Sequence, residues 1–154
     1  MNNIGIDKYK AKELSKKLNV LLSNYQVFYM NVRGFHWNIK GDNFFELHLK
    51  FEELYNNLLI KVDDIAERIL TLGEEPLHSY SDYLSISEIK EIQGLTNGKE
   101  GIRSILSAFE ILIIKQRELL SLSGAAGDEG TNALISDYIR EQEKLMWMYN
   151  AYIS

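Results

Sequence analysis

The chain has 154 residues, of which 45% are hydrophobic, 25% are charged and none is cysteine, and its formal net charge at pH 7 is −5. These values predict one globular domain, 1–154, and exclude a disordered chain, a disulfide framework and a thiolate metal site, while the negative charge argues against a dedicated nucleic-acid binder. Because no run of 18 or more residues is apolar and no basic-then-apolar segment opens the chain, we expect no membrane span, no cleaved signal and a cytoplasmic location.

Apolar residues recur at steps of three and four near the start of the chain, which predicts a helix over residues 7–38. The members of this stripe are Leu14, Leu18, Leu21, Tyr25, Phe28, Val32 and Phe35. Gly41 interrupts the chain, and a second stripe with a nearly unbroken seven-residue repeat runs from Phe44 to Leu72. Gly73 and Pro76 follow it and are typical stop signals of a helix.

A third stripe predicts a helix over residues 99–122, in which Gln116 is a polar member that needs a partner in the core. Two glycines then precede Asp128, which we expect to cap a fourth helix running to about residue 151. The apolar members of this fourth helix are Leu134, Tyr138, Leu145, Met148 and Tyr152.

About 25 residues between the second and third predicted helices lack a strong stripe, and a segment of this length usually carries some structure of its own. The capping-box pattern Ser85-Ile86-Ser87-Glu88 predicts a short helix near residues 86–92. The order of these elements predicts an all-α fold, a ferritin-like four-helix bundle with a short helix in the long crossover between helices two and three.

Potential metal ligands concentrate in the second predicted helix and just before it. Two of the three histidines, His36 and His48, lie twelve residues apart. Glu52 follows His48 at i+4, and Glu67 follows Asp63 at i+4, so each pair places two ligands about 6 Å apart on one helical face. Imidazole with several carboxylates suits iron, manganese or zinc. Singly, such an acidic pair is more often a solvated helix face, and a histidine beside a tryptophan is more often a packed residue.

One chain cannot bring His48 and Asp63 to the same ion, because the fifteen residues between them correspond to about 22 Å along a straight helix. Their directions differ by only about 60°, so both pairs face nearly the same side of the helix, which also carries Tyr55. A two-fold axis midway between the pairs places the His48 pair of one chain near the Asp63 pair of another. The spacing therefore predicts an isologous dimer with two shared metal sites.

An ordinary ferritin-type subunit needs Glu-x-x-His motifs on helices that face its own core. The only such motif here, Glu75 to His78, contains Pro76 and follows the end of the second predicted helix, so we do not expect it to form a site. This absence favours a centre between chains over one within a chain.

The segment Gly34–Tyr55, GFHWNIKGDNFFELHLKFEELY, resembles the signature of the Dps family (DNA-binding proteins from starved cells), and Asp63–Gly73, DDIAERILTLG, resembles the second block of that family. The resemblance implies a dodecameric, ferritin-like shell built from two-fold dimers with ferroxidase centres at the dimer interfaces. It further implies iron storage: Fe(II) is oxidised, usually by hydrogen peroxide and otherwise by dioxygen, and ferric mineral is deposited inside the shell. This activity would protect the cell against oxidative stress.

By position, the resemblance assigns His36 and His48 as iron ligands from one subunit and Asp63 and Glu67 as ligands from its partner. Glu52 occupies a position where relatives often carry an acidic ligand, and its own contact stays open. These residues are the expected catalytic and metal-binding set for Fe2+ and Fe3+, with manganese or zinc as substitutes.

Four more residues receive secondary roles. Asp128 and Glu129 open the fourth predicted helix, where relatives line three-fold pores with acidic side chains, and the alternative is that they cap the helix and complement its dipole. Trp37, beside a ligand, and Trp147 are candidate sacrificial electron donors, and the alternative is core packing.

DNA binding by a nucleoid-associated shell is weakly supported. The N-terminal lysines belong to a helix that begins almost at once, and Asp7 and Glu13 offset them, so a solvated face is expected. They are Lys8, Lys10, Lys12, Lys16 and Lys17. Two alternatives to an iron-storing ferroxidase stay open: a DNA-binding, nucleoid-compacting shell with incidental metal binding, which predicts DNA retention, and a purely structural bundle, which predicts assembly without saturable metal binding.

Overall fold

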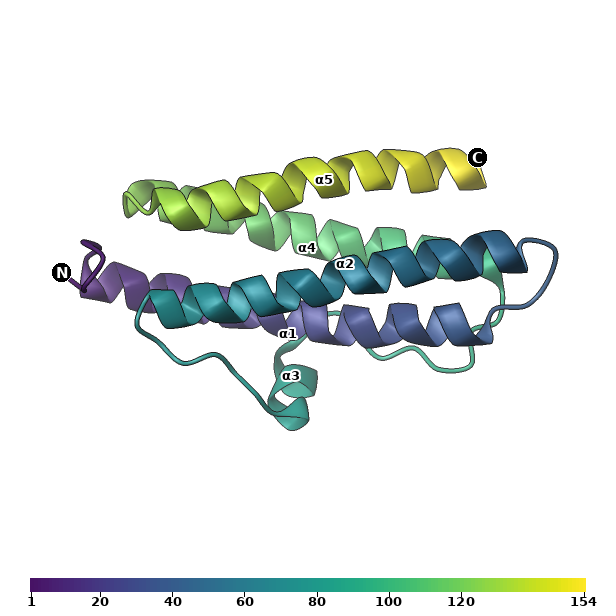
Figure 1. Ribbon diagram of the computed structural model, residues 1–154, viewed down its shortest axis with the longest axis horizontal. Helices are drawn as coiled ribbons and strands as arrows, with labels where there is room; N and C mark the ends of the chain where they lie inside the picture. Colours follow the sequence, from purple (N-terminus) through teal and green to yellow (C-terminus); the bar gives the residue numbers. More distant parts are fainter.

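Each apolar stripe of the sequence corresponds to a long helix in the computed structural model, which describes residues 1–154. The elements are α1 (Lys8–Asn38), α2 (Phe44–Thr71), α3 (Tyr80–Ile86), α4 (Gly98–Ala125) and α5 (Glu129–Ile153). The four long helices run side by side, and the N-terminus and C-terminus lie at opposite ends of the bundle (Figure 1). The predicted all-α, ferritin-like bundle is thereby confirmed. None of the helices combines the length and apolar character that a membrane crossing needs.

The ends of the helices follow from local signals. Asp7 caps α1, because its carboxylate accepts a hydrogen bond from the backbone N–H of Lys10 at 3.0 Å. Gly41 has a φ of 111°, which a residue with a side chain rarely adopts, and it permits the short turn that sets α2 antiparallel to α1. The backbone N–H of Lys40 in this turn donates to the carbonyl of Thr96 at 2.8 Å. This bond ties the start of α4 to the α1–α2 turn.

Aromatic side chains from different helices meet edge to face in the core. Phe28 of α1 meets Phe109 of α4 with ring centroids 5.3 Å apart, and Phe35 of α1 meets Phe51 of α2 at 6.1 Å. All four rings are almost fully buried. Burial of one such side chain contributes about 1.5–3 kcal/mol relative to leaving it in water, so these pairs hold the helices at fixed positions along the bundle.

Gln116 lies on the apolar stripe of α4, and its buried side chain has hydrogen-bond partners in the core. The Tyr25 hydroxyl donates to Gln116 Oε1, the Gln116 Nε2 donates to Gln142 Oε1 at 2.8 Å, and the Gln142 Nε2 donates to the Tyr25 hydroxyl. Tyr25, Gln116 and Gln142 come from α1, α4 and α5, and none exposes more than 1% of its surface. The ring of hydrogen bonds satisfies these buried polar groups and couples three helices.

The short crossover helix is present, but the predicted range of residues 86–92 is wrong. Helix α3 begins earlier because the Ser79 hydroxyl caps it, accepting from the backbone N–H of Asp82. After α3, the chain is extended and held against α1: Asn24 Oδ1 accepts from the backbone N–H groups of Glu88 and Ile89 at 3.0 and 3.1 Å. A helix capped by Ser85 would need the backbone N–H groups of Glu88 and Ile89 for its own first turn. Because both groups donate to Asn24 of α1 instead, that helix does not form.

The buried side of α5 also differs from the prediction. Of the five apolar residues expected there, only Tyr138 is buried, and Met148 is 44% exposed. The residues that are buried include two polar ones, and they are Thr131, Ile135, Tyr138, Ile139, Gln142 and Tyr149. Polar residues enter the core here because each finds a hydrogen-bond partner, which an apolar pattern alone does not reveal.

Candidate metal centre

The two histidines of the expected centre are locked to each other's backbone. His36 lies in the last turn of α1 and His48 in the second turn of α2. The Nδ1 of His36 lies 2.6 Å from the main-chain oxygen of His48, and the Nδ1 of His48 lies 2.7 Å from the main-chain oxygen of His36. The two rings stack, with centroids 3.8 Å apart and planes 11° from parallel.

This reciprocal pairing determines the tautomer of both imidazoles. A carbonyl oxygen can only accept a hydrogen bond, so each Nδ1 must carry the hydrogen. In the neutral ring the Nε2 then bears a free lone pair, which is the form in which a histidine binds a metal ion while its other nitrogen is held by the protein. Sequence spacing alone could not have shown this pairing, because it depends on how the end of α1 packs on α2.

Neighbouring side chains hold the rings and add a carboxylate. Phe44 stacks on His48 at 4.9 Å, and Tyr55 meets His36 edge to face at 5.3 Å. The Oε1 of Glu52 lies 4.0 Å from the Nε2 of His36, with about half of the Glu52 side chain exposed and His36 almost buried. The structure therefore brings His36, His48 and Glu52 together.

Asp63 and Glu67 do not join this group. Both lie farther along α2, and both are exposed. No three histidine, aspartate or glutamate side chains of the chain come close enough together to hold a metal ion. The assignment of Asp63 and Glu67 as ligands from a second subunit stays a prediction.

An intrachain di-metal site would need inward-facing acids from several helices, but between α2 and α5 a buried lysine is found instead. The side chain of Lys61 is buried there, and its ammonium donates to Asn57 Oδ1 at 2.6 Å and to both carboxylate oxygens of Glu141 at 3.0 and 3.1 Å. It also lies 5.0 Å from the centre of the Tyr138 ring. Lys61 was not predicted from the sequence, although its spacing of three and four from Leu58 and Ile65 places it on the apolar stripe.

Asp128 is a helix cap and not a pore residue. It is 1% exposed, and its carboxylate accepts from the Thr131 backbone N–H at 3.0 Å and from Arg68 Nη2 at 2.7 Å. A side chain buried in this way cannot line a channel, so the pore prediction is wrong for Asp128 and the cap alternative holds. Glu129 is exposed in the first turn of α5, and its pore role stays a prediction.

Neither tryptophan belongs to the core. Trp37 is 56% exposed and Trp147 is 67% exposed, so core packing within the subunit is wrong for both. The guanidinium of Arg33 covers the Trp37 ring at 4.8 Å. The proposed electron-donor role is untested.

The rejected Glu75–His78 motif lies outside every helix, with both side chains about 80% exposed.

Known proteins similar to the chain agree with this architecture. The sequence matches the Ferritin-like domain family over residues 15–154. It is 40% identical to the DNA protection during starvation protein of Porphyromonas gingivalis, over 96% of this chain and 93% of that protein. The structure is similar to the crystal structure of a Dps protein from Vibrio cholerae O1, described as a ferritin-like diiron-carboxylate protein, with a TM-score of 0.99, 54% identity and coverage of 100% and 97% of the two chains. It is also similar to Dps from Staphylococcus aureus, with a TM-score of 0.89, 32% identity and coverage of 93% and 96%.

Proposed function

The chain belongs to the Dps family of ferritin-like proteins, and from this we infer that it oxidises Fe(II) at centres shared by two subunits and stores the ferric product inside a hollow homo-oligomer. The family supports iron binding and a protective role. The residues of the centre, the oxidant and the dodecameric shell are our proposals for this chain.

One observation supports the proposal most: the reciprocal Nδ1 hydrogen bonds of His36 and His48. They leave both Nε2 lone pairs free before any ion arrives, and the Nε2 of His36 lies 4.0 Å from a carboxylate oxygen of Glu52. Because these side chains are already held in place, they lose little conformational entropy when a metal ion binds. A purely structural role for the two histidines would not need both Nε2 atoms to be free.

We propose that each centre is completed across a two-fold axis. In this centre, Fe(II) is bound by His36, His48 and Glu52 of one subunit together with Asp63 and Glu67 of a second subunit. Asp63 and Glu67 are exposed on α2 and can therefore reach an ion held by another subunit. Neutral imidazole binds Fe(II) without adding charge, and the carboxylates stabilise the more highly charged Fe(III) product. The exposed apolar side chains of α2, Leu49 and Leu59 among them, would be covered by that second subunit.

Hydrogen peroxide is the proposed oxidant. One peroxide takes one electron from each of two Fe(II) ions, its O–O bond breaks, and two protons complete two molecules of water. The two Fe(III) ions then pass to mineral in the shell. Because peroxide and Fe(II) are consumed together in a two-electron reduction, hydroxyl radical does not form.

The test is anaerobic loading of the purified protein with Fe(II), followed by a peroxide pulse and measurement of ferric absorbance. We expect rapid oxidation into a soluble mineral, and we expect His48→Ala/Asp63→Ala to lose it. His78→Ala, which removes an exposed histidine outside the centre, should behave as the unchanged protein. Oxidation no faster than that of free iron in buffer, with precipitation and no effect of the double substitution, would rule out the proposal.

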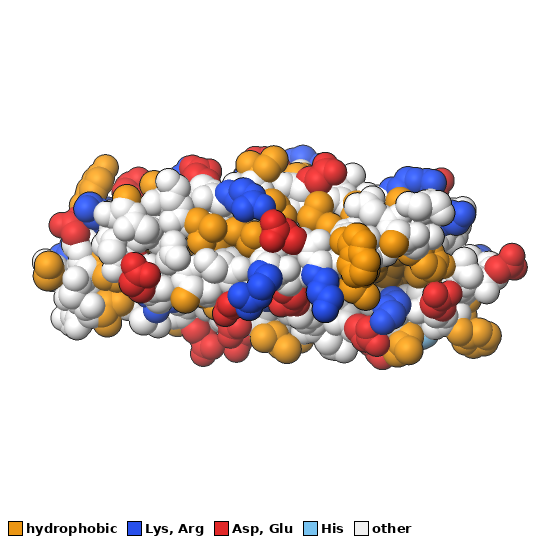
Figure 2. Space-filling model, turned by 90° about the horizontal axis from the view of Figure 1, so that it is seen from above, with side chains coloured by type: hydrophobic (Ala, Val, Ile, Leu, Met, Phe, Trp, Pro, Cys, Tyr) orange, Lys and Arg blue, Asp and Glu red, His pale blue; other side chains and the backbone are white.

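DNA binding, the alternative function, has less support. Two of the N-terminal lysines are paired, Lys16 with Glu13 at 3.3 Å and Lys17 with Glu118 at 2.9 Å. The face in Figure 2 carries acidic and basic side chains close together, with apolar ones between them, and no broad basic patch. We expect no retardation of duplex DNA by the assembled protein at about 0.15 M salt, because binding to phosphates needs concentrated positive charge. A clear shift at that salt would favour the nucleoid-compacting shell.

A further inference from the structure

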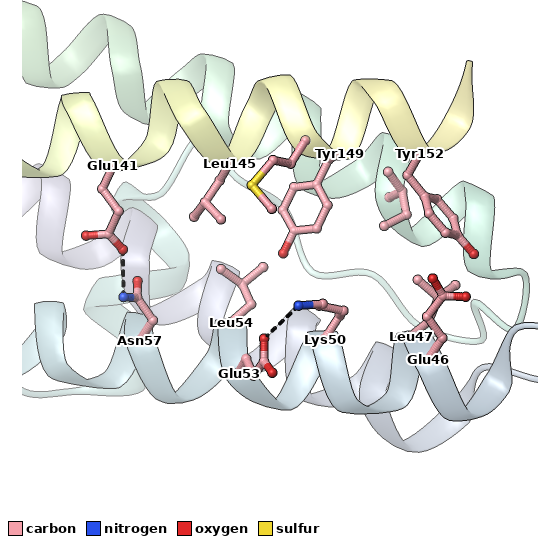
Figure 3. Close-up of a pocket in the computed structure, with 12 residues that line it drawn as sticks. Glu46, Leu47, Lys50, Glu53, Leu54, Asn57, Glu141, Leu145, Tyr149 and Tyr152 are labelled. Carbon is pink, nitrogen blue, oxygen red and sulfur yellow. Dashed lines mark hydrogen bonds and ion pairs between the residues drawn. The ribbon is translucent and has the colours of Figure 1, made fainter.

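A cavity of about 340 Å³ lies between α2 and α5 (Figure 3), and no histidine lines it. Its α2 wall is a single helical face that runs from Glu46 to Asn57, and its α5 wall runs from Glu141 to Tyr152. Ile102 of α4 also lines it, and apolar side chains make up most of the lining. The volume is in the range of small-molecule sites, about 300–1,000 Å³.

Tyr149 directs an unpartnered hydroxyl into this cavity. Its side chain descends from α5 toward α2, next to Leu54 and Lys50 (Figure 3). Only 9% of Tyr149 is exposed, yet its hydroxyl makes no hydrogen bond within the chain. Burial, followed by the nearby Glu53 carboxylate, raises the pKa of Tyr149 to about 12, so the phenol is neutral at pH 7 and can both donate and accept. Because the hydroxyl opens onto the cavity and has no partner within the chain, a ligand in the cavity can reach it.

The charges around the cavity are mainly negative. Three carboxylates line it, those of Glu46, Glu53 and Glu141, against the single ammonium of Lys50. Lys50 pairs with Glu53 at 3.2 Å, and Glu141 pairs with Lys61, whereas Glu46 has no ion pair. An anion would be repelled here, and the apolar walls provide no ligand cluster for a bare metal ion. Among charged organic ligands, these groups favour a cation.

We propose that this cavity binds an organic ammonium ion with a hydrocarbon body, of the size of an arylalkylamine. The ammonium donates hydrogen bonds to the Tyr149 hydroxyl oxygen and to a rim carboxylate. The hydrocarbon body lies against Leu54, Leu145 and Ile102. This site is separate from the proposed iron centre, because none of its lining residues belongs to that centre.

The probes are 4-phenylbutylamine, 4-phenylbutanol and 4-phenylbutanoate, which share one hydrocarbon body and differ in the charge of the head group. We expect calorimetric titration of the assembled protein to show saturable binding of the amine and at least tenfold weaker binding of the other two. Tyr149→Phe should weaken amine binding by at least about tenfold, the effect of one hydrogen bond from a charged donor. The fold should tolerate this change, because the hydroxyl has no partner to lose. Glu46→Gln should also weaken amine binding.

The control is Tyr80→Phe, which removes the hydroxyl of a tyrosine that is 82% exposed on α3, outside the cavity, and it should leave amine binding unchanged. Equal affinity for the three head groups, or unchanged affinity in Tyr149→Phe, would overturn the proposal. No binding of the amine by the assembly would also overturn it. Iron oxidation should be the same in wild type and Tyr149→Phe, so the two proposals stand or fall separately.

Discussion

At His36 and His48, two main-chain carbonyls set the tautomer of the imidazoles. Backbone carbonyls do not titrate, so the arrangement needs no carboxylate behind the histidines to orient them. The same bonds join the end of α1 to the start of α2. The residues that would bind iron therefore also stabilise the α1–α2 turn, and their two roles must be separated by experiment.

The backbone acceptors make one substitution informative. His48→Ala removes one imidazole but keeps the His48 carbonyl, so His36 should retain its Nδ1 hydrogen bond and its orientation. Co(II) serves as a spectroscopic substitute for Fe(II), and we expect its affinity to fall by at least about tenfold. Replacing even a residue that only hydrogen-bonds to a metal ligand typically lowers metal affinity by about 10-fold to 100-fold. Anaerobic titration followed by cobalt absorbance measures it. Equal affinities in His48→Ala and His78→Ala would contradict the assignment.

Lys61 and Glu141 should differ in their effect on stability. Glu141→Ala leaves the ammonium of Lys61 buried without its counter-charge, which costs about 2–4 kcal/mol of unfolding free energy. Lys61→Met leaves the Glu141 carboxylate, which is 40% exposed and can be hydrated, so the cost should be about 1 kcal/mol or less. Urea unfolding at one fixed protein concentration compares them. A larger loss for Lys61→Met would show that the hydrogen bonds of the ammonium matter more than the uncompensated charge.

At the scale of the elements, the long helices were predictable and the irregular segments were not. The stripes of α1, α2 and α4 give their helices to within a few residues, because burial of an apolar face dominates each one. The position of α3 depends on Asn24 of α1, a contact between residues far apart in the sequence. The buried face of α5 depends on partners for Thr131 and Gln142, which hydrophobicity does not report. Likewise, the spacing of His36 and His48 suggested a site, but not the exchange of hydrogen bonds that orients them.

Two helix caps of the same residue type should contribute differently. Asp7 at α1 is exposed, so Asp7→Ala should cost about 1 kcal/mol or less of unfolding free energy. Asp128→Ala should cost at least about 2 kcal/mol, because it removes the α5 cap and also leaves Arg68 without its partner. Asp128→Asn keeps a capping side chain and should fall between them. Chemical denaturation of the three variants tests this order, and equal losses for both alanine variants would refute it.

At the scale of the whole molecule, the proposed ligands lie at two separate places on one subunit. His36 of α1 lies with His48 and Glu52 of α2, whereas Asp63 and Glu67 are exposed about 22 Å farther along α2. The Tyr25 ring of hydrogen bonds occupies the bundle centre, and the Lys61–Glu141 ion pair joins α2 to α5. Activity should therefore depend on how subunits pair, and a correctly folded monomer should not oxidise iron efficiently.

The most direct test of the shared centre is complementation between two inactive variants. In a dimer of one His48→Ala subunit and one Asp63→Ala subunit, one centre carries both substitutions and the other carries neither. Co-assembly of the two variants should therefore restore peroxide-driven Fe(II) oxidation well above the level of either variant alone, with about one intact centre in each mixed dimer. No recovery in verified mixed assemblies would contradict the account and place the two residues in separate sites.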